Sequence, residues 1–297
     1  MSIYPTVTVI IPFYGKSESQ IINCLKALSN QTYFKDKIEI VVIDNNLVPV
    51  LKEQLKENYD ITILHEYKYG SYSARNKGIE IAKGDVLAFT DSDCIPHIDW
   101  IKNSVSALQL QNLNVAIGGN IVFTFKDYKQ ISIYEFYDCT LHLRQEHYVK
   151  NYGYAATANL IVPKHIIIKV GIFNTKYYSG GDKEWGERAT KSGFKLVFDK
   201  DVIVFHPARA TAFSIIKKNI RTIGGEFVRI QTKGLNRISI FAYEKVAIKS
   251  RRDFIANGMS MFNKITRVKI ILFFYTVQAF RLLEALRLFL GGAPQRQ

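Results

Sequence analysis

Hydrophobic residues in the first part of the chain fall into short runs separated by segments of helical spacing. The runs occupy residues 6–11, 38–43, 61–64 and 86–90, and each contains β-branched side chains. Runs of this length that alternate with helical segments are typical of βαβ units, whose parallel sheet is buried on both faces. The pattern therefore predicts an α/β fold with a mostly parallel central sheet.

The segment between the first two runs predicts a helix with a readable start. Ser17 and Gln20 have the spacing of a capping box, in which two side chains satisfy backbone N–H groups of the first turn. Four side chains of this segment share one helical face, and we expect them to be buried: Ile21, Cys24, Leu25 and Leu28.

Three later runs, at residues 115–123, 157–162 and 194–205, predict further strands. The last run is interrupted at 199–201, which indicates either a hairpin or a strand with a turn. The stretch "DKEWGERATKSGF" predicts a short helix that ends before Gly193.

Strand patterns cease near residue 211. The chain from 212 to 297 has helical spacing, apart from a break around 233–239. We therefore expect two domains, an α/β domain at 1–211 and a basic helical region at 212–297.

The positive charge of the chain is concentrated in this helical region. The chain has 40 Lys and Arg residues against 26 Asp and Glu residues, a net charge of +14. Residues 212–297 alone hold 16 basic and 4 acidic residues, which leaves a net charge of only +2 for residues 1–211. A local excess of this kind indicates a polyanionic partner, either nucleic acid or an anionic membrane surface.

The segment 269–290 is the most apolar in the chain, but its longest uncharged stretch, 270–280, has eleven residues. A spanning helix needs about 20. A helix here would gather apolar side chains on one face, which suits a position in the membrane interface. The alternatives are a helix packed on the α/β domain or a contact with a second subunit in a homo-oligomer. The face consists of Val268, Leu272, Tyr275, Ala279, Leu283, Leu286 and Leu290.

Cysteine usage indicates a reduced compartment. Cys24, Cys94 and Cys139 are odd in number and lack the paired spacing of a zinc or redox motif. The first residues contain no basic segment followed by a small-residue cleavage site, so we expect no signal peptide.

Polar residues that could bind a ligand or take part in catalysis follow the predicted strands, and open α/β sheets bind their ligands at these strand ends. "DSD" at 91–93 places Asp91 and Asp93 on the same side of an extended chain. Two close carboxylates repel unless a cation lies between them, and hard oxygen ligands suit Mg²⁺ or Mn²⁺. The alternative is a turn in which Asp91 or Ser92 caps a helix near His97. The loop "GSYSARNKG" at 70–78 favours the site, because its Arg and Lys residues at a helix start suit an anion.

The chain resembles the family 2 glycosyltransferases in five stretches taken in order: "VTVIIPFY", "IEIVVIDN", "SYSARNKGIEIAKGDVLAFTDSDCIP", "GGDKEWGERATKSGFKLVF" and "VIVFHPAR". The resemblance covers about residues 5–211. It implies a GT-A type fold, with a Rossmann-like nucleotide-binding domain, and a non-processive enzyme of the bacterial surface-glycan type. Processive synthases of the family carry a "QxxRW" motif and several spanning helices, and neither is found in this sequence.

The resemblance also implies roles for particular residues. Asp93, with Asp91 and His206, would hold Mn²⁺ or Mg²⁺ against the two phosphates of a UDP- or GDP-sugar. The residues implied in nucleotide-sugar binding are Pro12, Phe13, Tyr14, Asp44, Arg75, Asn76, Asp91, Ser92 and Arg209.

Asp182 takes the position of the family's general base, which removes the proton from the acceptor hydroxyl. The family usually has Glu before this Asp, whereas this chain has Gly181. Glu184 is therefore a competitor for the same role, although its spacing also allows a salt bridge with Arg188. Trp185 is either an apolar platform for the acceptor sugar or a core indole.

These expectations describe an inverting enzyme that moves one sugar to a hydroxyl of a glycan or lipid-linked acceptor. We expect it in the cytoplasm, peripheral on the inner face of the cell membrane, because an anionic membrane explains the basic region without nucleic acid. The aromatic-rich segment 128–154 is expected either to border the acceptor site or to pack under the sheet.

Two other functions compete with this interpretation. A sugar-nucleotide nucleotidyltransferase would have a Gly-rich, basic loop after the first strand, and "PFYGKSES" has one Gly and one Lys. A non-catalytic membrane or nucleic-acid binding protein would use only the basic region, which shows neither a helix-turn-helix pattern nor the aromatic pattern of an RNA-binding motif.

Overall fold

The computed structural model describes residues 4–295 and divides into two compact units. Unit 1 comprises Met1–Val122, Gln145–Thr175 and Gly181–Pro207. Unit 2 comprises Phe123–Arg144, Lys176–Gly180 and Ala208–Gln297, so it includes two segments that precede residue 211.

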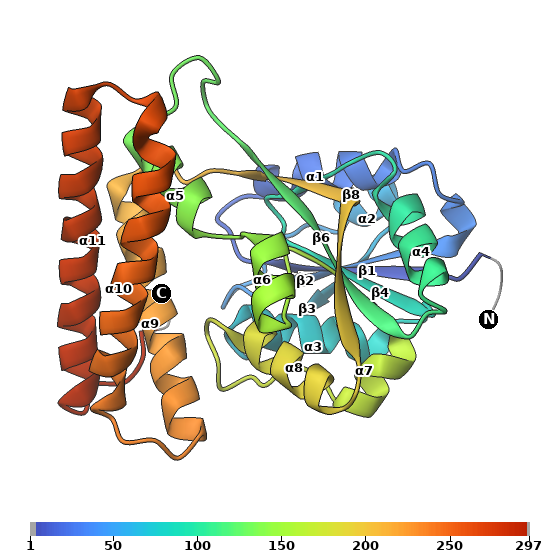
Figure 1. Ribbon diagram of the computed structural model, residues 1–297. Coiled ribbons are helices and arrows are strands. Elements are labelled where there is room, and N and C mark those ends of the chain that lie inside the picture. The colour runs from blue at the N-terminus through green and yellow to red at the C-terminus, as the bar shows by residue number, and fades with distance from the viewer. Residues whose placement is uncertain (1–3, 296–297) are drawn as a thin grey trace. The chain divides into compact units, whose positions relative to one another are not determined.

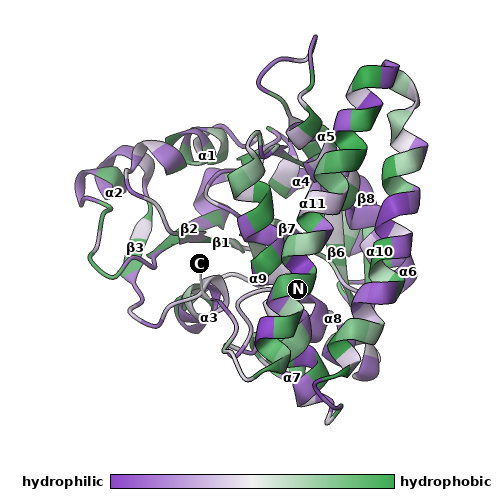
Figure 2. Cartoon of the chain, turned by 90° about the vertical axis from the view of Figure 1, so that its left-hand side faces the viewer, coloured by the Kyte–Doolittle hydropathy of each residue, from purple (hydrophilic) through white to green (hydrophobic). Residues whose placement is uncertain are grey.

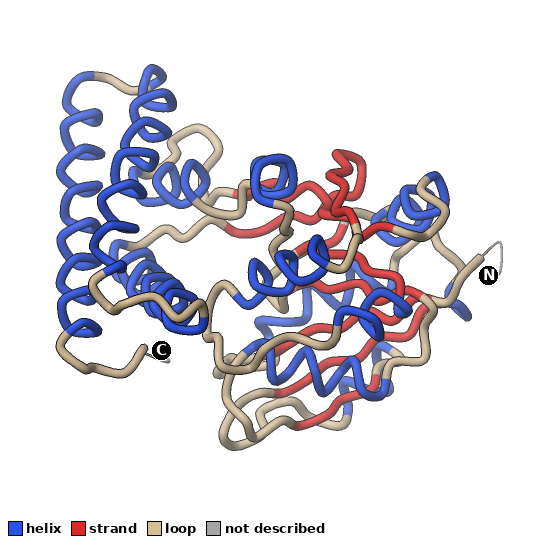
Figure 3. The backbone as a smooth tube through the Cα atoms, turned by 60° about the horizontal axis from the view of Figure 1, so that its bottom comes forward, coloured by secondary structure: helices blue, strands red, loops and turns tan. Residues whose placement is uncertain are grey.

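One eight-stranded sheet forms the centre of the α/β part, with helices on both of its faces (Figure 3). The strand order is β3-β2-β1-β4-β7-β6-β8-β5. The strands span Val7–Phe13 (β1), Ile38–Asp44 (β2), Thr62–His65 (β3), Val86–Thr90 (β4), Ile95–Pro96 (β5), Val115–Thr124 (β6), Asn159–Pro163 (β7) and Lys195–Pro207 (β8).

The four strands predicted first form the parallel half of this sheet. β1 pairs in parallel with β2 and β4, and β2 pairs in parallel with β3. β7 then pairs with β4 and β6 in antiparallel fashion, so the sheet is mixed beyond β4. All five residues of β4 are buried, as expected for a central strand with helices on both faces.

Helices α1 (Ser19–Ser29), α2 (Gln54–Tyr59) and α4 (Trp100–Leu110) lie on one side of the sheet in Figure 1. Helices α3 (Ser71–Ile81), α7 (Lys164–Val170) and α8 (Gly181–Lys191) lie on the other, and α6 spans Gln145–Tyr152. The buried face of α1 consists of the four predicted residues. The predicted capping box is wrong, because Oε1 of Gln20 accepts from the backbone N–H of Lys16, and Oγ of Ser17 accepts from the backbone N–H of Ser19 instead of that of Gln20.

Gly78 allows α3 to lie close against the sheet. A Cβ at this position would come within 2.6 Å of Ile10 Cγ2 and 2.9 Å of Ile43 Cδ1, on β1 and β2. Such contacts are shorter than packed carbons tolerate, so the helix needs glycine here. The start of α3 is thereby fixed at the ends of β1 and β2, where the candidate residues lie.

The run at 194–205 forms one continuous strand, β8, rather than a hairpin. The Asp199 side chain accepts from the backbone N–H of Asp201, a local bond that accommodates the polar interruption without reversing the chain. The helix before it, α8, ends as predicted: Gly193 has φ +86°, the left-handed conformation that favours glycine just past a helix end.

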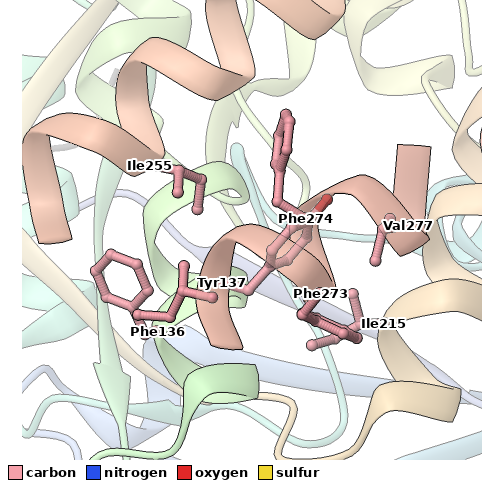
Figure 4. Close-up of a cluster of buried hydrophobic side chains, with 8 residues drawn as sticks. Phe136, Tyr137, Ile215, Ile255, Phe273, Phe274 and Val277 are labelled. Carbon is pink, nitrogen blue, oxygen red and sulfur yellow. The ribbon is translucent and has the colours of Figure 1, made fainter. Parts of the chain in front are cut away.

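Unit 2 contains α5 (Ile133–Leu141), α9 (Ala212–Thr232), α10 (Ser239–Gly258) and α11 (Lys264–Phe289), and the break between α9 and α10 lies where it was expected. Short 3-10 turns span Lys35–Lys37 and Met259–Met261. One core cluster joins Phe136 and Tyr137 of α5 to Phe273, Phe274 and Val277 of α11 (Figure 4). Within residues 4–295, no helix combines the length and the apolar character needed to cross a membrane.

Candidate active site

Four ligating side chains of unit 1 converge after β4 and at the end of β8. One donor atom each from Asp91, Asp93, Cys94 and His206 lies within 4.8 Å of the other three. The three residues predicted to hold a metal are therefore brought together from positions more than a hundred residues apart. Cys94 was missed as a neighbour, although it directly follows Asp93 in the sequence.

His206 presents its Nε2 atom to this group. Nδ1 lies 2.8 Å from the carbonyl oxygen of Pro207, and Nε2 lies 3.9 Å from Oδ1 of Asp93. A ring nitrogen beside a carbonyl must carry the proton, which puts the lone pair on Nε2, the atom turned toward Asp93. His206 is buried, while the Asp93 side chain is 52% exposed and open to a ligand from solvent.

The donor set fits a hard divalent ion. Two carboxylates and one imidazole are ligands that Mn²⁺ and Mg²⁺ accept. Cys94 is fully buried, and burial, together with the charges of Asp91 and Asp93, raises the pKa of its thiol well above the ordinary value. The two carboxylates are the part of this set that suits an oxygen-preferring ion.

Arg75 holds Asp91 in place. Its guanidinium pairs with Oδ1 of Asp91 and lies 5.7 Å from the centre of the Tyr72 ring. The Arg75 side chain is 3% exposed, and its buried Nε has no hydrogen-bond partner in the described part of the chain. The site therefore contains the positive charge of the buried Arg75 guanidinium as well as the carboxylates of Asp91 and Asp93.

Asn76 has a different partner. Its side-chain N–H donates to the carbonyl of Phe173 at 2.7 Å, and its side-chain oxygen accepts from the N–H of Phe173 at 3.0 Å. The residue is buried and both ends of the amide are engaged. This favours a role in fixing the Phe173 segment over direct contact with phosphates.

Asp44 is likewise engaged by the protein. Its carboxylate accepts from the backbone N–H groups of Asn46, Val50 and Leu51 and from the side chain of Asn46, at 2.6–3.0 Å. Burial raises the pKa of Asp44, but these bonds to the ionised form outweigh it and lower the pKa overall. Asp44 is 1% exposed, so these contacts favour a structural role in which its carboxylate holds the loop after β2 in place.

Its neighbour Asn45 was noted at a strand end but given no role. The side chain of Asn45 donates to the carbonyls of Glu66 and Lys68 and accepts from the N–H of Gly70, at 2.7–2.9 Å. These three bonds tie the end of β2 to the loop that leads into α3. No sequence motif signals these hydrogen bonds, because the partners of Asn45 lie more than twenty residues away.

The residues after β1 divide into core and surface. Phe13 is fully buried, whereas Tyr14 is 55% exposed and contacts Tyr69 edge-to-face at 5.6 Å. Pro12 and Ser92 are partly exposed. Tyr14 is the member of this group that offers an aromatic face to a ligand.

Asp182 lies in the first turn of α8. Its backbone N–H donates to the hydroxyl of Tyr72 at 3.2 Å, and its Oδ1 accepts from the N–H of Lys183 at 2.9 Å. Burial raises the pKa of the carboxyl, and hydrogen bonds together with the charge of Arg75 oppose this only in part. A carboxylate with a raised pKa is a better proton acceptor than an ordinary one.

The Tyr72 ring also explains the departure from the family pattern at position 181. A Cβ at Gly181 would come within 2.7 Å of Tyr72 Cε2. The ring therefore occupies the space in which a Glu side chain would begin.

Glu184 and Trp185 are both committed elsewhere. The carboxylate of Glu184 accepts two bonds from the guanidinium of Arg188, at 2.7 and 3.2 Å. Trp185 is fully buried, and its indole N–H donates to the carbonyl of Gly171 at 2.9 Å. These contacts favour the salt-bridge and core-indole alternatives for the two residues.

Arg209 belongs to unit 2, where it pairs with a buried acid. The backbone N–H of Arg209 donates to Oδ2 of Asp138 at 3.0 Å and its guanidinium lies 3.3 Å from the same oxygen. His142 and Lys218 contact Oδ1 at 2.8 and 3.4 Å. Lys218 and the other cations hold the pKa of Asp138 far below its ordinary value despite burial. No motif in the sequence signals this cluster, because Asp138 and Lys218 lie 80 residues apart.

Comparison with known sequences gives one consistent family. The family described as "Glycosyl transferase family 2" matches residues 8–173. Glycosyltransferase AglE of Haloferax volcanii is 38% identical over 244 residues, which cover 80% of this chain and 78% of AglE. A Methanococcus voltae enzyme named dolichyl N-acetyl-alpha-D-glucosaminyl phosphate 3-beta-D-2,3-diacetamido-2,3-dideoxy-beta-D-glucuronosyltransferase is 24% identical over 250 residues, covering 80% of this chain and 78% of its own.

Solved structures show the same fold. Mannosyltransferase PcManGT from Pyrobaculum calidifontis, in complex with GDP-Man and Mn²⁺, superposes with a TM-score of 0.63 at 18% identity, over 97% of this chain and 87% of PcManGT. GalNAc-T7 with UDP, GalNAc and Mn²⁺ gives a TM-score of 0.55 at 17% identity, over 78% and 48% of the two chains.

Proposed function

The chain belongs to glycosyl transferase family 2 and is a glycosyltransferase with a GT-A fold, and from this we propose that it is an inverting enzyme that uses a UDP- or GDP-sugar. It would move one sugar to a hydroxyl of a glycan or lipid-linked acceptor. The observation that carries the proposal is the convergence of Asp91, Asp93 and His206 beside the buried Arg75, at the ends of β4 and β8.

We assign the holding of Mn²⁺ or Mg²⁺ to Asp93 and His206, with Asp91 as the third ligand. A bound ion would supply Lewis-acid stabilisation of the departing diphosphate. Arg75 orients Asp91 and adds positive charge beside the phosphates. The phosphate role of Arg209 stays a prediction from the family resemblance, since its described contacts are with Asp138.

Asp182 is the proposed general base. It would take the proton of the acceptor hydroxyl while the oxygen attacks the anomeric carbon on the face opposite the diphosphate, so that one displacement inverts the configuration. The raised pKa of Asp182 and the engagement of Glu184 by Arg188 support this choice between the two acids.

The nucleotide side of the site would use Tyr14 and Ser92 for direct contact. Pro12 and the buried Phe13 shape the pocket wall from the end of β1. We assign Asp44 and Asn76 to the same site through the segments that they hold, the loop after β2 and the Phe173 segment.

The acceptor side has an aromatic group close to Asp182. Tyr154 stacks on Tyr148, with ring centres 4.9 Å apart and planes at 16°. Tyr154 also stacks on Tyr152, with ring centres 6.4 Å apart and planes at 27°. A Cβ at Gly186, one turn after Asp182 on α8, would meet Tyr154 Cβ at 2.5 Å. We therefore assign acceptor binding to this group in place of the buried Trp185.

We also propose that the enzyme acts in surface-glycan assembly, peripheral on the inner face of the cell membrane. The basic excess of residues 212–297 supports an anionic membrane as its partner. The name of the Methanococcus voltae relative includes a dolichyl phosphate sugar, which supports a lipid-linked acceptor.

The test is a screen of UDP- and GDP-sugars with Mn²⁺ and a membrane lipid extract as acceptor. The proposal requires Mn²⁺-dependent release of the nucleoside diphosphate and transfer of the sugar to an extracted lipid or glycan. Release of pyrophosphate from a nucleoside triphosphate and a sugar phosphate would instead identify a nucleotidyltransferase. Retention of the donor anomer in the product would overturn the inverting mechanism.

A further inference from the structure

The exposed side of α11 is apolar along nearly its whole length. From Ile271 to Leu290, a stretch that the structure describes throughout, Arg287 is the one charged residue that is partly exposed, and its side chain, 39% exposed, is paired with Glu284. Twenty residues of helix span about 30 Å, so the apolar strip is long. Figure 2 shows the hydrophobic residues that recur along this helix. The exposed residues are Ile271, Leu272, Tyr275, Thr276, Ala279, Phe280, Leu282, Leu283, Leu286, Phe289 and Leu290.

The polar residues of the same helix point inward, against the usual arrangement. Arg281 is 1% exposed and bonds both carboxylate oxygens of Glu244, on α10, at 2.7 and 2.9 Å. It also donates to the backbone and side-chain oxygens of Asn219, on α9, at 3.1 Å. Gln278 accepts from Arg251 at 3.1 Å.

This network fixes the rotation of α11. Turning the helix so that the leucines were buried would leave Glu244 buried without its principal cation, which is strongly unfavourable. The inner side also packs Phe273, Phe274 and Val277 into the core shown in Figure 4. These buried contacts therefore keep the apolar strip on the outer surface of unit 2.

A contiguous exposed apolar surface marks a contact with another partner. The charged residues next to the strip indicate which one. Across the described helix Lys264–Phe289, the exposed charges are Lys264, Arg267 and Lys269 in the first two turns, and the partly exposed Arg287 in the last turn is also cationic. On α10 the exposed charges are Lys245, Lys249, Arg252 and a single acid, Asp253.

A second copy of the chain would bring the same cationic residues toward this surface and would be repelled. An anionic bilayer offers both an apolar interior and negative headgroups, so it complements the strip and its cations together. Lipid cannot surround α11 on all sides, because the opposite side of this helix carries the buried ionic network.

We propose that the outer face of α11 is a membrane-docking surface, which lies in the headgroup region of an anionic bilayer with its leucines and phenylalanines toward the acyl chains. The proposal rests on the membrane part of the proposed function and is independent of sugar transfer. It states that apolar insertion by α11, and not charge alone, holds the protein on the membrane.

The experiment measures partitioning of the full chain onto vesicles of phosphatidylcholine with 30% phosphatidylglycerol, and onto phosphatidylcholine alone. Leu272→Glu combined with Leu283→Glu changes two side chains that are 63% and 62% exposed. The matched control is Leu110→Glu with Ile168→Glu, two side chains of unit 1 that are 82% and 74% exposed. Equal melting temperatures establish that all three proteins are folded.

We expect the wild type and the control to bind the anionic vesicles, and the α11 variant to partition at least about tenfold more weakly, because two leucines can no longer insert. The control adds the same two negative charges, so a change in net charge does not explain such a difference. A Leu272→Trp variant should show a blue-shifted emission on binding, since Trp100 and Trp185 are fully buried and report little.

Three outcomes would overturn the inference. If the α11 variant binds as the wild type does, charge alone suffices and the membrane partner stands without this surface. If the wild type binds no vesicle, the membrane part of the proposed function fails as well, while sugar transfer to a soluble acceptor remains a separate measurement. If the wild type is a dimer and the α11 variant a monomer, the surface is a subunit interface.

Discussion

The hydroxyl of Tyr72 accepts a hydrogen bond from the backbone N–H of Asp182 at 3.2 Å. Tyr72 lies on α3, where its ring also faces the guanidinium of Arg75 at 5.7 Å. One side chain thus links the residue assigned to the donor phosphates with the residue assigned to the acceptor proton. The relative position of these two groups is what an in-line displacement requires.

The choice between the two acids of α8 can be tested directly. Asp182→Asn should lower kcat by about 10²–10⁴-fold, the usual contribution of a general base, because an amide cannot take the proton. Glu184→Gln should leave kcat within about tenfold of the wild type, since that carboxylate is paired with Arg188. Steady-state transfer rates identify the general base. If Glu184→Gln lowers kcat more than Asp182→Asn does, Glu184 is the base instead of Asp182.

The pH dependence of transfer follows from the raised pKa of Asp182. The base must be ionised, so kcat/KM should fall as the pH drops through that pKa, above the ordinary value of about 3.9. Tyr72→Phe removes a hydrogen bond that favours the ionised form, and it should move this acidic limb to higher pH. A limb that stays in place, or moves to lower pH, would contradict the assignment.

The same shift predicts an effect on stability. A carboxyl with a raised folded-state pKa contributes stability at low pH that is lost as the pH rises through that pKa. Asp182→Asn removes this loss and should raise the melting temperature at neutral pH, with a smaller difference at acidic pH. A lower melting temperature at neutral pH would show that the ionised carboxylate stabilises the fold.

Asp138 should behave in the opposite way. Its pKa is held low by Lys218, His142 and Arg209, so its contribution to stability is present above the ordinary pKa and is lost as the pH falls. Asp138→Ala leaves Lys218 and Arg209 without their buried acid and should cost about 3–5 kcal/mol of unfolding free energy in urea titration. Asp253→Ala is the control, because its pair with Arg252 is exposed and should be worth less than about 1 kcal/mol. Similar losses in both variants would mean that burial of the pair is unimportant.

Local patterns in the sequence predicted the elements better than the contacts between them. The β4 strand matches the predicted run 86–90, and the buried face of α1 has the predicted members, because both follow from periodicity alone. The predicted apolar face of α11 is also exposed as a unit. Whether lipid covers it stays a prediction.

Roles that depend on distant partners could not be predicted in this way. Asn76 and Phe173 are 97 residues apart, and Asp138 and Lys218 are 80 apart. In both cases the residue type allows many partners, and only the folded chain selects one. The motif at 91–93 was informative because two carboxylates on one side of an extended chain favour a positively charged neighbour, and the structure places the guanidinium of Arg75 against Asp91.

Binding of Mn²⁺ tests the central claim most directly. Electron paramagnetic resonance can titrate free Mn²⁺ against the wild type and Asp93→Ala, each with UDP and with GDP present. We expect the wild type to bind Mn²⁺ together with one of the two nucleotides, and Asp93→Ala to bind it at least about tenfold more weakly at an unchanged melting temperature, since a charged ligand is lost. Equal Mn²⁺ affinity in the two proteins would contradict the assignment of Asp93 as the ligand on which sugar transfer depends.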